Sequence, residues 1–223
     1  MSWQEAEIDL ATPDCSSCPQ HCCVRLSVPL TGCDLDRLAR ALKVPLRCFV
    51  EVATSAEPAP GLFRLGRQGP WWRLLLARTP GTTPACVFLR DFPGGYRRCA
   101  VYADRPTYCR AYPSFRSSRG ELLPLPGRPC PENALAELGT RVDWGDRLAR
   151  LEAEQAADRL AVESWNRRLD RLPGAEEATV EHFLAYQLEL RRRLARANAL
   201  VDAVAMGELL ARLEGDGDPE GAR

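Results

Sequence analysis

The feature that most constrains this chain is a cluster of four cysteines within nine residues: Cys15, Cys18, Cys22 and Cys23. A thiolate is the soft, anionic ligand that zinc and iron–sulfur clusters prefer, and the C-x-x-C spacing lets one tight turn aim two sulfurs at a common point. A single C-x-x-C motif is weak evidence of a metal site. Four further cysteines follow in turn-rich settings, so we predict a metal-binding set of eight that also includes Cys86, Cys99, Cys109 and Cys130.

The cellular compartment decides between metal ligation and disulfide bonds. The first ten residues are acidic and contain no apolar stretch typical of a signal peptide. No apolar run approaches the roughly 18 residues that a membrane helix needs. We therefore expect a soluble, cytoplasmic protein, in which thiols are kept reduced. In that compartment the spacing of the ten cysteines favours metal ligands over a disulfide framework.

The expected cofactor is zinc or an iron–sulfur cluster, and ligand type alone does not separate the two, since both bind thiolates. The adjacent pair Cys22–Cys23 constrains the geometry. If these residues are extended, their side chains point to opposite faces. Either two sites then lie on either side of the strand, or one of the pair belongs to the apolar core. The division of the eight cysteines between one or two sites stays open.

Two cysteines and both histidines fall outside this set. Cys33 and Cys48 stand alone beside a predicted helix and a turn, and we interpret them as small buried hydrophobic residues. His21 lies inside the first cluster and could donate a nitrogen, although the cysteines suffice. His182 lies on a predicted amphipathic helix and is expected to be a surface or core residue.

The charge balance limits the partners. The sequence contains 30 basic and 30 acidic residues, so no global basic field favours nucleic acid or an anionic membrane surface, and neither is expected as a partner. Arg105 and Arg110 flank the thiolate-rich stretch. We expect them to offset its negative charge or to anchor backbone carbonyls, a structural role, not a catalytic one.

The distribution of cysteines also divides the chain, because all ten lie between Cys15 and Cys130. We predict a cysteine-cluster metal-binding domain over residues 1–135 and a helical hairpin tail over residues 136–223. The fold class is α+β: a small, cysteine-rich, metal-organised domain with short strands and turns, followed by a C-terminal antiparallel helical hairpin.

Local patterns predict the individual elements. Thr31 or Asp34 can cap a helix whose apolar residues share one face, and Pro45 stops it. From about Asp143 the helical texture continues to a break at Pro173–Gly174, and a second helix follows to about Leu209. The remaining expectations are a strand over 24–28, turn and loop over 46–61, a hairpin of 62–65 with 71–76, a short strand over 86–89 and a hairpin of 114–117 with 122–123.

These motifs resemble the YkgJ-type cysteine-cluster family, described as a candidate zinc- or iron-chelating domain. The resemblance covers about residues 14–131. It rests on C-x-x-C…C-C, then Cys-Val-Phe-Leu, then Cys-x-x-Tyr-x-x-Arg-Pro-x-x-Cys-Arg-x-Tyr-Pro and a late cysteine. It implies that the eight cysteines named above are the functional set. The chain departs from the family pattern where three residues, 19–21, separate the second and third cysteines instead of two.

The resemblance implies several functions. The leading hypothesis is a metal-binding protein whose metal organises the fold and which could act as a chelator, a carrier or a redox-responsive module. Some relatives resemble flagellin lysine methylases, which implies an iron–sulfur-dependent protein-modifying enzyme as an alternative. The chain has no G-x-G-x-x-G loop for a methyl donor. A third hypothesis is an interaction module with a purely structural metal, whose C-terminal helices bind a protein partner.

Overall fold

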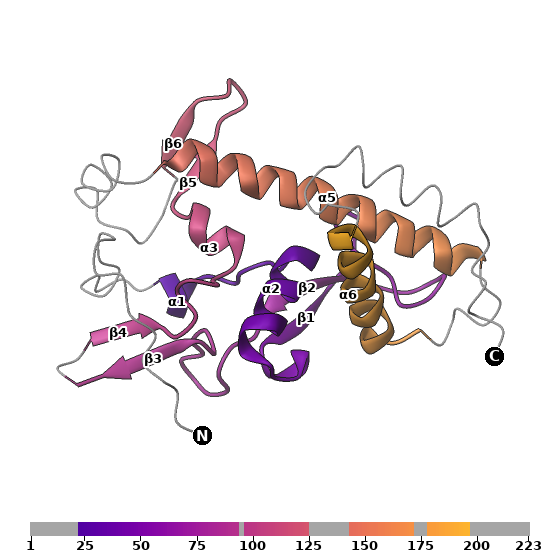
Figure 1. The fold of residues 1–223 in the computed structure, drawn as a ribbon. Coiled ribbons are helices and arrows are strands. Elements are labelled where there is room, and N and C mark those ends of the chain that lie inside the picture. Colours follow the sequence, from indigo (N-terminus) through magenta and orange to yellow (C-terminus); the bar gives the residue numbers. More distant parts are fainter. Residues whose placement is uncertain (1–21, 94–95, 125–142, 172–177, 197–223) are drawn as a thin grey trace.

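The computed structural model describes residues 22–93, 96–124, 143–171 and 178–196. These residues combine short antiparallel strand pairs with helices, which confirms the α+β class and the C-terminal helical hairpin. Figure 1 shows the long helix α5 running along one side of the molecule, with α2, α3 and α6 beside it. In order, the elements are α1 (Cys22–Arg25), α2 (Gly32–Leu42), the 3-10 helix η1 (Leu46–Cys48), β1 (Val50–Ser55), β2 (Trp71–Leu76), β3 (Leu89–Phe92), β4 (Tyr96–Cys99), α3 (Thr107–Ala111), β5 (Ser114–Arg116), β6 (Leu122–Pro124), α5 (Trp144–Arg171) and α6 (Val180–Arg196).

Helix α2 begins and ends as the sequence predicts. Thr31 is its N-cap: the Thr31 hydroxyl accepts a hydrogen bond from Asp34 N (3.2 Å), and the Asp34 carboxylate accepts one from Thr31 N (3.1 Å). This reciprocal capping box pairs two backbone donors that the first turn leaves without partners. Lys43 ends the helix in the left-handed conformation, with φ of 53°, two residues before Pro45.

The partner of strand β2 differs from the predicted one. The residues 62–65 contribute only an isolated bridge between Phe63 and Trp72, and β2 instead pairs antiparallel with β1, with Val52 opposite Leu74. The prediction of turn and loop over 46–61 was therefore wrong for 50–55. The cause is the alternation in Val50-Glu-Val52-Ala-Thr54, where every second residue is β-branched and fits one face of a pleated sheet.

Two short strands predicted around the cysteines were also wrong. Residues 22–25 form one helical turn, closed by Leu26 N donating to Cys22 O (2.9 Å), where a strand over 24–28 was expected. Cys86 forms an isolated bridge with Arg78 and begins a turn, with Leu89 N donating to its carbonyl (2.9 Å), and β3 starts only at Leu89. The hairpin of β5 with β6 is confirmed.

The tail helices share one hydrophobic core with the rest of the chain. Phe183 of α6 stacks on Phe63, with ring centroids 3.8 Å apart and an interplanar angle of 11°, and Trp165 of α5 meets Phe183 edge-on. Leu35 and Leu38 of α2 belong to the same core. The predicted boundary near residue 135 falls within residues 125–142, outside the described part of the chain, so the division into two domains stays a prediction.

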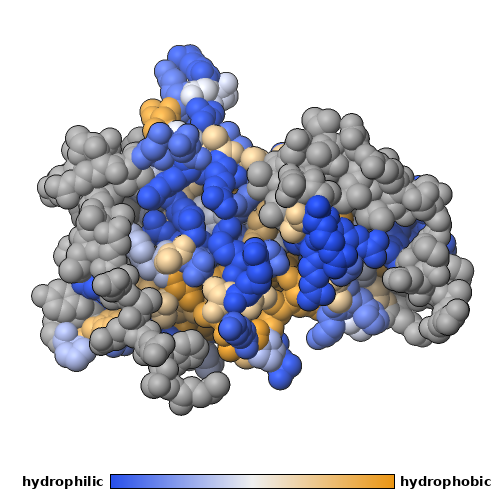
Figure 2. Space-filling view, in the orientation of Figure 1, coloured by the Kyte–Doolittle hydropathy of each residue, from blue (hydrophilic) through white to orange (hydrophobic). Residues whose placement is uncertain are grey.

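Hydrophilic and apolar residues are distributed unevenly over the face of the molecule drawn in Figure 2. Figure 2 shows hydrophilic residues gathered over α3 and the neighbouring end of α5, and apolar residues nearer α2 and its sheet. Among the described helices, none has the length and apolarity needed to cross a membrane.

Candidate metal centre

Four separate elements carry the described cysteines of the predicted set. Cys22 and Cys23 lie on α1, Cys86 on the turn before β3, Cys99 at the end of β4 and Cys109 on α3. Figure 1 shows α1, β4 and α3 on the same side of the molecule. The backbone fixes part of this arrangement: Cys86 N donates to Cys23 O (2.7 Å), and Ala100 N, next to Cys99, donates to Phe88 O (2.8 Å).

The electrostatics of these thiols show that they interact. Burial raises the pKa of Cys86 to about 11 and that of Cys99 to about 12, and the charge of Cys23 adds to both increases. Burial also raises the pKa of Cys109 well above its usual value, with further contributions from the charges of Cys99, Cys23 and Cys86. Elements separated by many residues thus bring four thiols within electrostatic reach of one another.

The pKa of Cys23 shifts in the opposite direction. A hydrogen bond from the Cys22 side chain lowers the pKa of Cys23 to about 7, against the effect of burial, and the Arg105 guanidinium contributes to the decrease. The adjacent pair therefore does not split to opposite faces, as an extended backbone would require. On a helical turn, neighbouring side chains diverge by about 100° and can face the same region.

The two arginines of the thiolate-rich stretch take the structural roles that were predicted. Arg105 lies over the ring of Tyr102, with 4.2 Å from Cζ to the ring centroid, and favours the Cys23 thiolate. Arg110 anchors backbone carbonyls: its Nε donates to Arg105 O (3.0 Å) and its Nη2 donates to Ala103 O. These contacts hold the loop that leads into α3 and hence the position of Cys109.

A buried polar network, absent from the sequence-based prediction, fixes the start of α3. Thr107 N donates to Asp34 Oδ1 (2.9 Å), and the Thr107 hydroxyl lies within hydrogen-bonding distance of both Asp34 Oδ1 (3.2 Å) and Glu154 Oε2. Arg37 Nη2 donates to the Thr107 hydroxyl (2.8 Å) and to Asp34. Burial raises the pKa of Asp34, while Arg37 and the N–H groups of Thr31 and Thr107 oppose the increase. The network ties α2 and α5 to α3, two residues before Cys109.

The signal for this network was present in the sequence. Glu154 follows Leu148 and Leu151 at the spacing of the buried face of α5, and it is fully buried. A carboxylate within an apolar helical stripe requires a buried partner. The sequence identified Thr31 or Asp34 as the cap of the helix, but the role of Asp34 toward Thr107 depends on tertiary contacts.

The remaining described cysteines and histidine differ in their surroundings. Burial raises the pKa of Cys33 to about 12, and the described charged groups that act on it are Arg191, Glu154, Asp158 and Asp34. Cys48 is exposed on η1, so its predicted burial was wrong. His182 is exposed on α6, which was one of its two expected placements. Its Nδ1 accepts a hydrogen bond from the backbone N of Thr179. Cys15, Cys18, Cys130 and His21 lie outside the described residues.

The donor chemistry fits zinc or iron, since the converging groups are thiols. Within the described ranges alone, no three Cys, His, Asp or Glu side chains form a group that could hold a metal ion. The described cysteines provide part of the predicted set, and its three other members lie outside those ranges. The assignment of the eight ligands therefore stays a prediction.

Comparison with known proteins gives a family for this site. Residues 14–131 match the family model named CxxCxxCC, a putative zinc- or iron-chelating domain. The chain belongs to the CxxCxxCC family. The match confirms the resemblance stated from the cysteine motifs, and its limits, one residue before Cys15 and one after Cys130, enclose the complete predicted set. No curated protein and no solved structure gives a significant match.

Proposed function

We propose that this CxxCxxCC protein binds zinc or an iron–sulfur cluster through its cysteines and that the bound metal organises the cysteine-bearing part of the fold. The observation that carries the proposal is that four elements bring Cys23, Cys86, Cys99 and Cys109 together. The backbone of Cys86 is hydrogen-bonded to that of Cys23, and the charges of neighbouring thiols add to the raised pKa values of Cys86, Cys99 and Cys109. The complete proposed ligand set is Cys15, Cys18, Cys22, Cys23, Cys86, Cys99, Cys109 and Cys130.

The raised pKa values explain why a metal suits this region. Cys86, Cys99 and Cys109 are buried together, so without a cation each would remain a neutral thiol at pH 7. A bound metal ion offsets the charge of several thiolates at once and replaces their protons. Of the four converging thiols Cys23, Cys86, Cys99 and Cys109, Cys23 is the closest to ionisation, and we propose that it supplies the first thiolate to an incoming metal.

The proposal also concerns the compartment and the role. Thiolate ligands require reduced cysteines, so we propose a cytoplasmic location. The metal would hold α1, β4 and α3 together, where the described backbone offers only short elements, and this points to a folding role. A protein partner for the C-terminal helices stays a prediction.

Cysteine variants test the proposal with a matched control. Cys99→Ser and Cys109→Ser should each lose most of the zinc or iron measured by elemental analysis after purification without chelators. Cys48→Ser should keep the full amount, because Cys48 is exposed on η1 and lies outside the proposed ligand set. Far-ultraviolet circular dichroism of each variant separates metal loss from global unfolding. Full metal content in folded Cys99→Ser and Cys109→Ser, or equal loss in Cys48→Ser, contradicts the proposal.

A further inference from the structure

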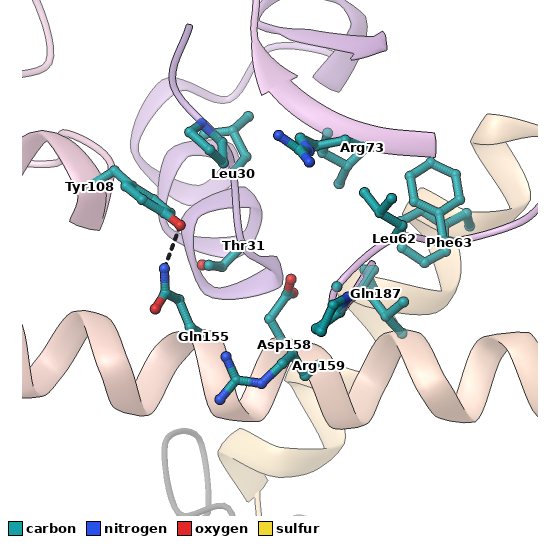
Figure 3. A pocket seen from close by; sticks show the side chains of 16 residues that line it. Leu30, Thr31, Leu62, Phe63, Arg73, Tyr108, Gln155, Asp158, Arg159 and Gln187 are labelled. Carbon is teal, nitrogen blue, oxygen red and sulfur yellow. Dashed lines mark hydrogen bonds between the residues drawn. The ribbon is translucent and has the colours of Figure 1, made fainter. Parts of the chain in front are cut away.

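A cavity of about 260 Å³ lies between the start of α2, strand β2 and the two tail helices (Figure 3). Helix α3 also reaches it, because Tyr108 is one of the lining residues and directly precedes Cys109. Its volume lies just below the range of about 300–1,000 Å³ that is typical of sites for drug-sized ligands. The cavity therefore suits a small metabolite.

One part of the lining is apolar and rigid. Leu62, Phe63, Val162 and Phe183 line it, and each of the four is at most 3% exposed. The rings of Phe63 and Phe183 stack on each other, which fixes both side chains. An aliphatic or aromatic group of a ligand would be buried against this wall.

The opposite part is polar and contains an amide without a hydrogen-bond partner. Gln187 lines the cavity and is 1% exposed, and within the described chain neither its Oε1 nor its Nε2 has a hydrogen-bond partner. Buried amides in native proteins are normally paired, so this one indicates a missing ligand group. A Cβ at Gly32 would lie 2.5 Å from Gln187 Oε1, and only glycine leaves this approach open.

A carboxylate lies beside this amide. Asp158 lines the cavity with its side chain 16% exposed, and its Oδ1 accepts from Gly32 N (2.7 Å) and lies 3.7 Å from Arg191 Nη2. Figure 3 shows the Asp158 carboxylate directed toward the space between Thr31 and Gln187. A carboxylate and an amide oxygen side by side are acceptors for an ammonium group.

Two arginines line different sides of the cavity (Figure 3). Arg73 of β2 and Arg159 of α5 are exposed lining residues, and neither forms an ion pair within the described ranges. The hydroxyl of Tyr108 accepts a hydrogen bond from Gln155 Nε2 at another side of the cavity (Figure 3). Guanidinium groups bind carboxylates with two parallel hydrogen bonds.

We propose that this cavity binds a small zwitterion with an apolar body, of the kind that an apolar α-amino acid presents. The ammonium group of the ligand binds Asp158 and Gln187 Oε1, its carboxylate binds Arg73, and its side chain packs on Phe63. The site is independent of the proposed metal ligands, although Tyr108 belongs to the same short helix as Cys109.

Isothermal titration of the metal-loaded full chain with three matched compounds tests the proposal. L-leucine carries both charges, L-leucinamide lacks the carboxylate and 4-methylpentanoate lacks the ammonium group. L-leucine should bind, and each analogue should bind about tenfold or more weakly, because each loses a charge-assisted contact. L-phenylalanine serves as a second zwitterion with a larger apolar body.

A single substitution at the rim assigns the carboxylate contact. Arg73→Gln should weaken L-leucine binding about tenfold and leave the weaker binding of L-leucinamide unchanged. Arg73 is exposed, so the fold should persist. Arg47→Gln, at an exposed arginine of η1 outside the cavity, is the control and should bind like the wild type. No binding of either amino acid at millimolar concentration, or equal binding of L-leucine and its two analogues, overturns the proposal.

Discussion

The buried hydroxyl of Thr107 offers a test of how the tail helix positions the cysteine-bearing helix α3. Thr107→Val keeps the shape of the side chain and removes the oxygen that contacts Asp34, Glu154 and Arg37. The hydrogen bond from Thr107 N to Asp34 Oδ1 is unaffected. The change therefore isolates the hydroxyl.

The expected loss of stability in Thr107→Val follows from the charged partners of the hydroxyl. The hydroxyl donates its single hydrogen to one carboxylate at a time and accepts from a guanidinium, and hydrogen bonds to charged groups are each worth roughly 1.5–3 kcal/mol. Arg37 still reaches Asp34, which offsets part of the loss. We expect the free energy of unfolding to fall by about 2–4 kcal/mol, a large fraction of the roughly 5–15 kcal/mol of a typical domain.

Urea unfolding of the metal-loaded protein, followed by circular dichroism, measures this change. Thr107→Ser retains the hydroxyl and loses one methyl group, so it should cost only about 1 kcal/mol. Thr54→Val, at an exposed threonine of β1, should stay within about 0.5 kcal/mol of the wild type. A Thr107→Val variant as stable as the wild type, or more stable than Thr107→Ser, refutes the reasoning.

The same variant bears on metal binding. Partners that orient metal ligands typically contribute about 10–100-fold to affinity. Because Thr107 begins the helix that carries Cys109, Thr107→Val should weaken metal binding by at least about tenfold in competition with a colorimetric chelator. Unchanged affinity would mean that the network stabilises the fold without positioning the thiol.

Three further predictions concern the core and the polar end of the cavity. Burial raises the pKa of Asp158 from 3.8 to about 6, so folding favours its protonated form. This stabilisation is complete below pH 3.8 and is lost as the pH rises through about 6. In urea titrations, the free energy of unfolding of the wild type relative to Asp158→Asn should therefore fall by up to about 3 kcal/mol between about pH 4 and 7. Gly32→Ala should lower the free energy of unfolding by about 1–3 kcal/mol, because the new methyl group meets Gln187 at 2.5 Å; wild-type stability in urea would contradict the close approach. Phe183→Ala should cost about 3–5 kcal/mol in the same assay, whereas Phe92→Ala, at a residue 42% exposed, should cost less than about 0.5; similar losses would contradict the shared core.

Local signals predicted local structure well. The candidate caps Thr31 and Asp34 and the apolar face after them predicted α2, and the turn residues near Gly120 predicted the pairing of β5 with β6. Both features depend on contacts within a few residues. Strand β1 was missed because its partner lies about twenty residues away, beyond a loop, and the alternation from Val50 to Thr54 is short.

For the candidate site too, the sequence predicted local features and not the contacts between distant residues. The sequence identified the candidate metal-binding cysteines and their spacing, and the family match covers all eight of them. It could not show that α1 turns Cys22 toward Cys23, because a helical turn of four residues has no periodicity to detect. Nor could it show that Glu154, more than forty residues after Cys109, reaches Thr107 at the start of α3, since that contact requires α5 to pack on α3.

The central claim is that the cysteines of this CxxCxxCC protein hold a metal. The most direct measurement is the zinc and iron content per chain of protein purified without chelators or immobilised nickel, combined with titration of reactive thiols and a visible absorption spectrum. The account predicts zinc or iron at one or two sites per chain and thiols that become reactive only after the metal is removed; visible absorbance that bleaches with dithionite would identify an iron–sulfur cluster. A folded protein without zinc or iron, in which all ten cysteines react as free thiols, would contradict it.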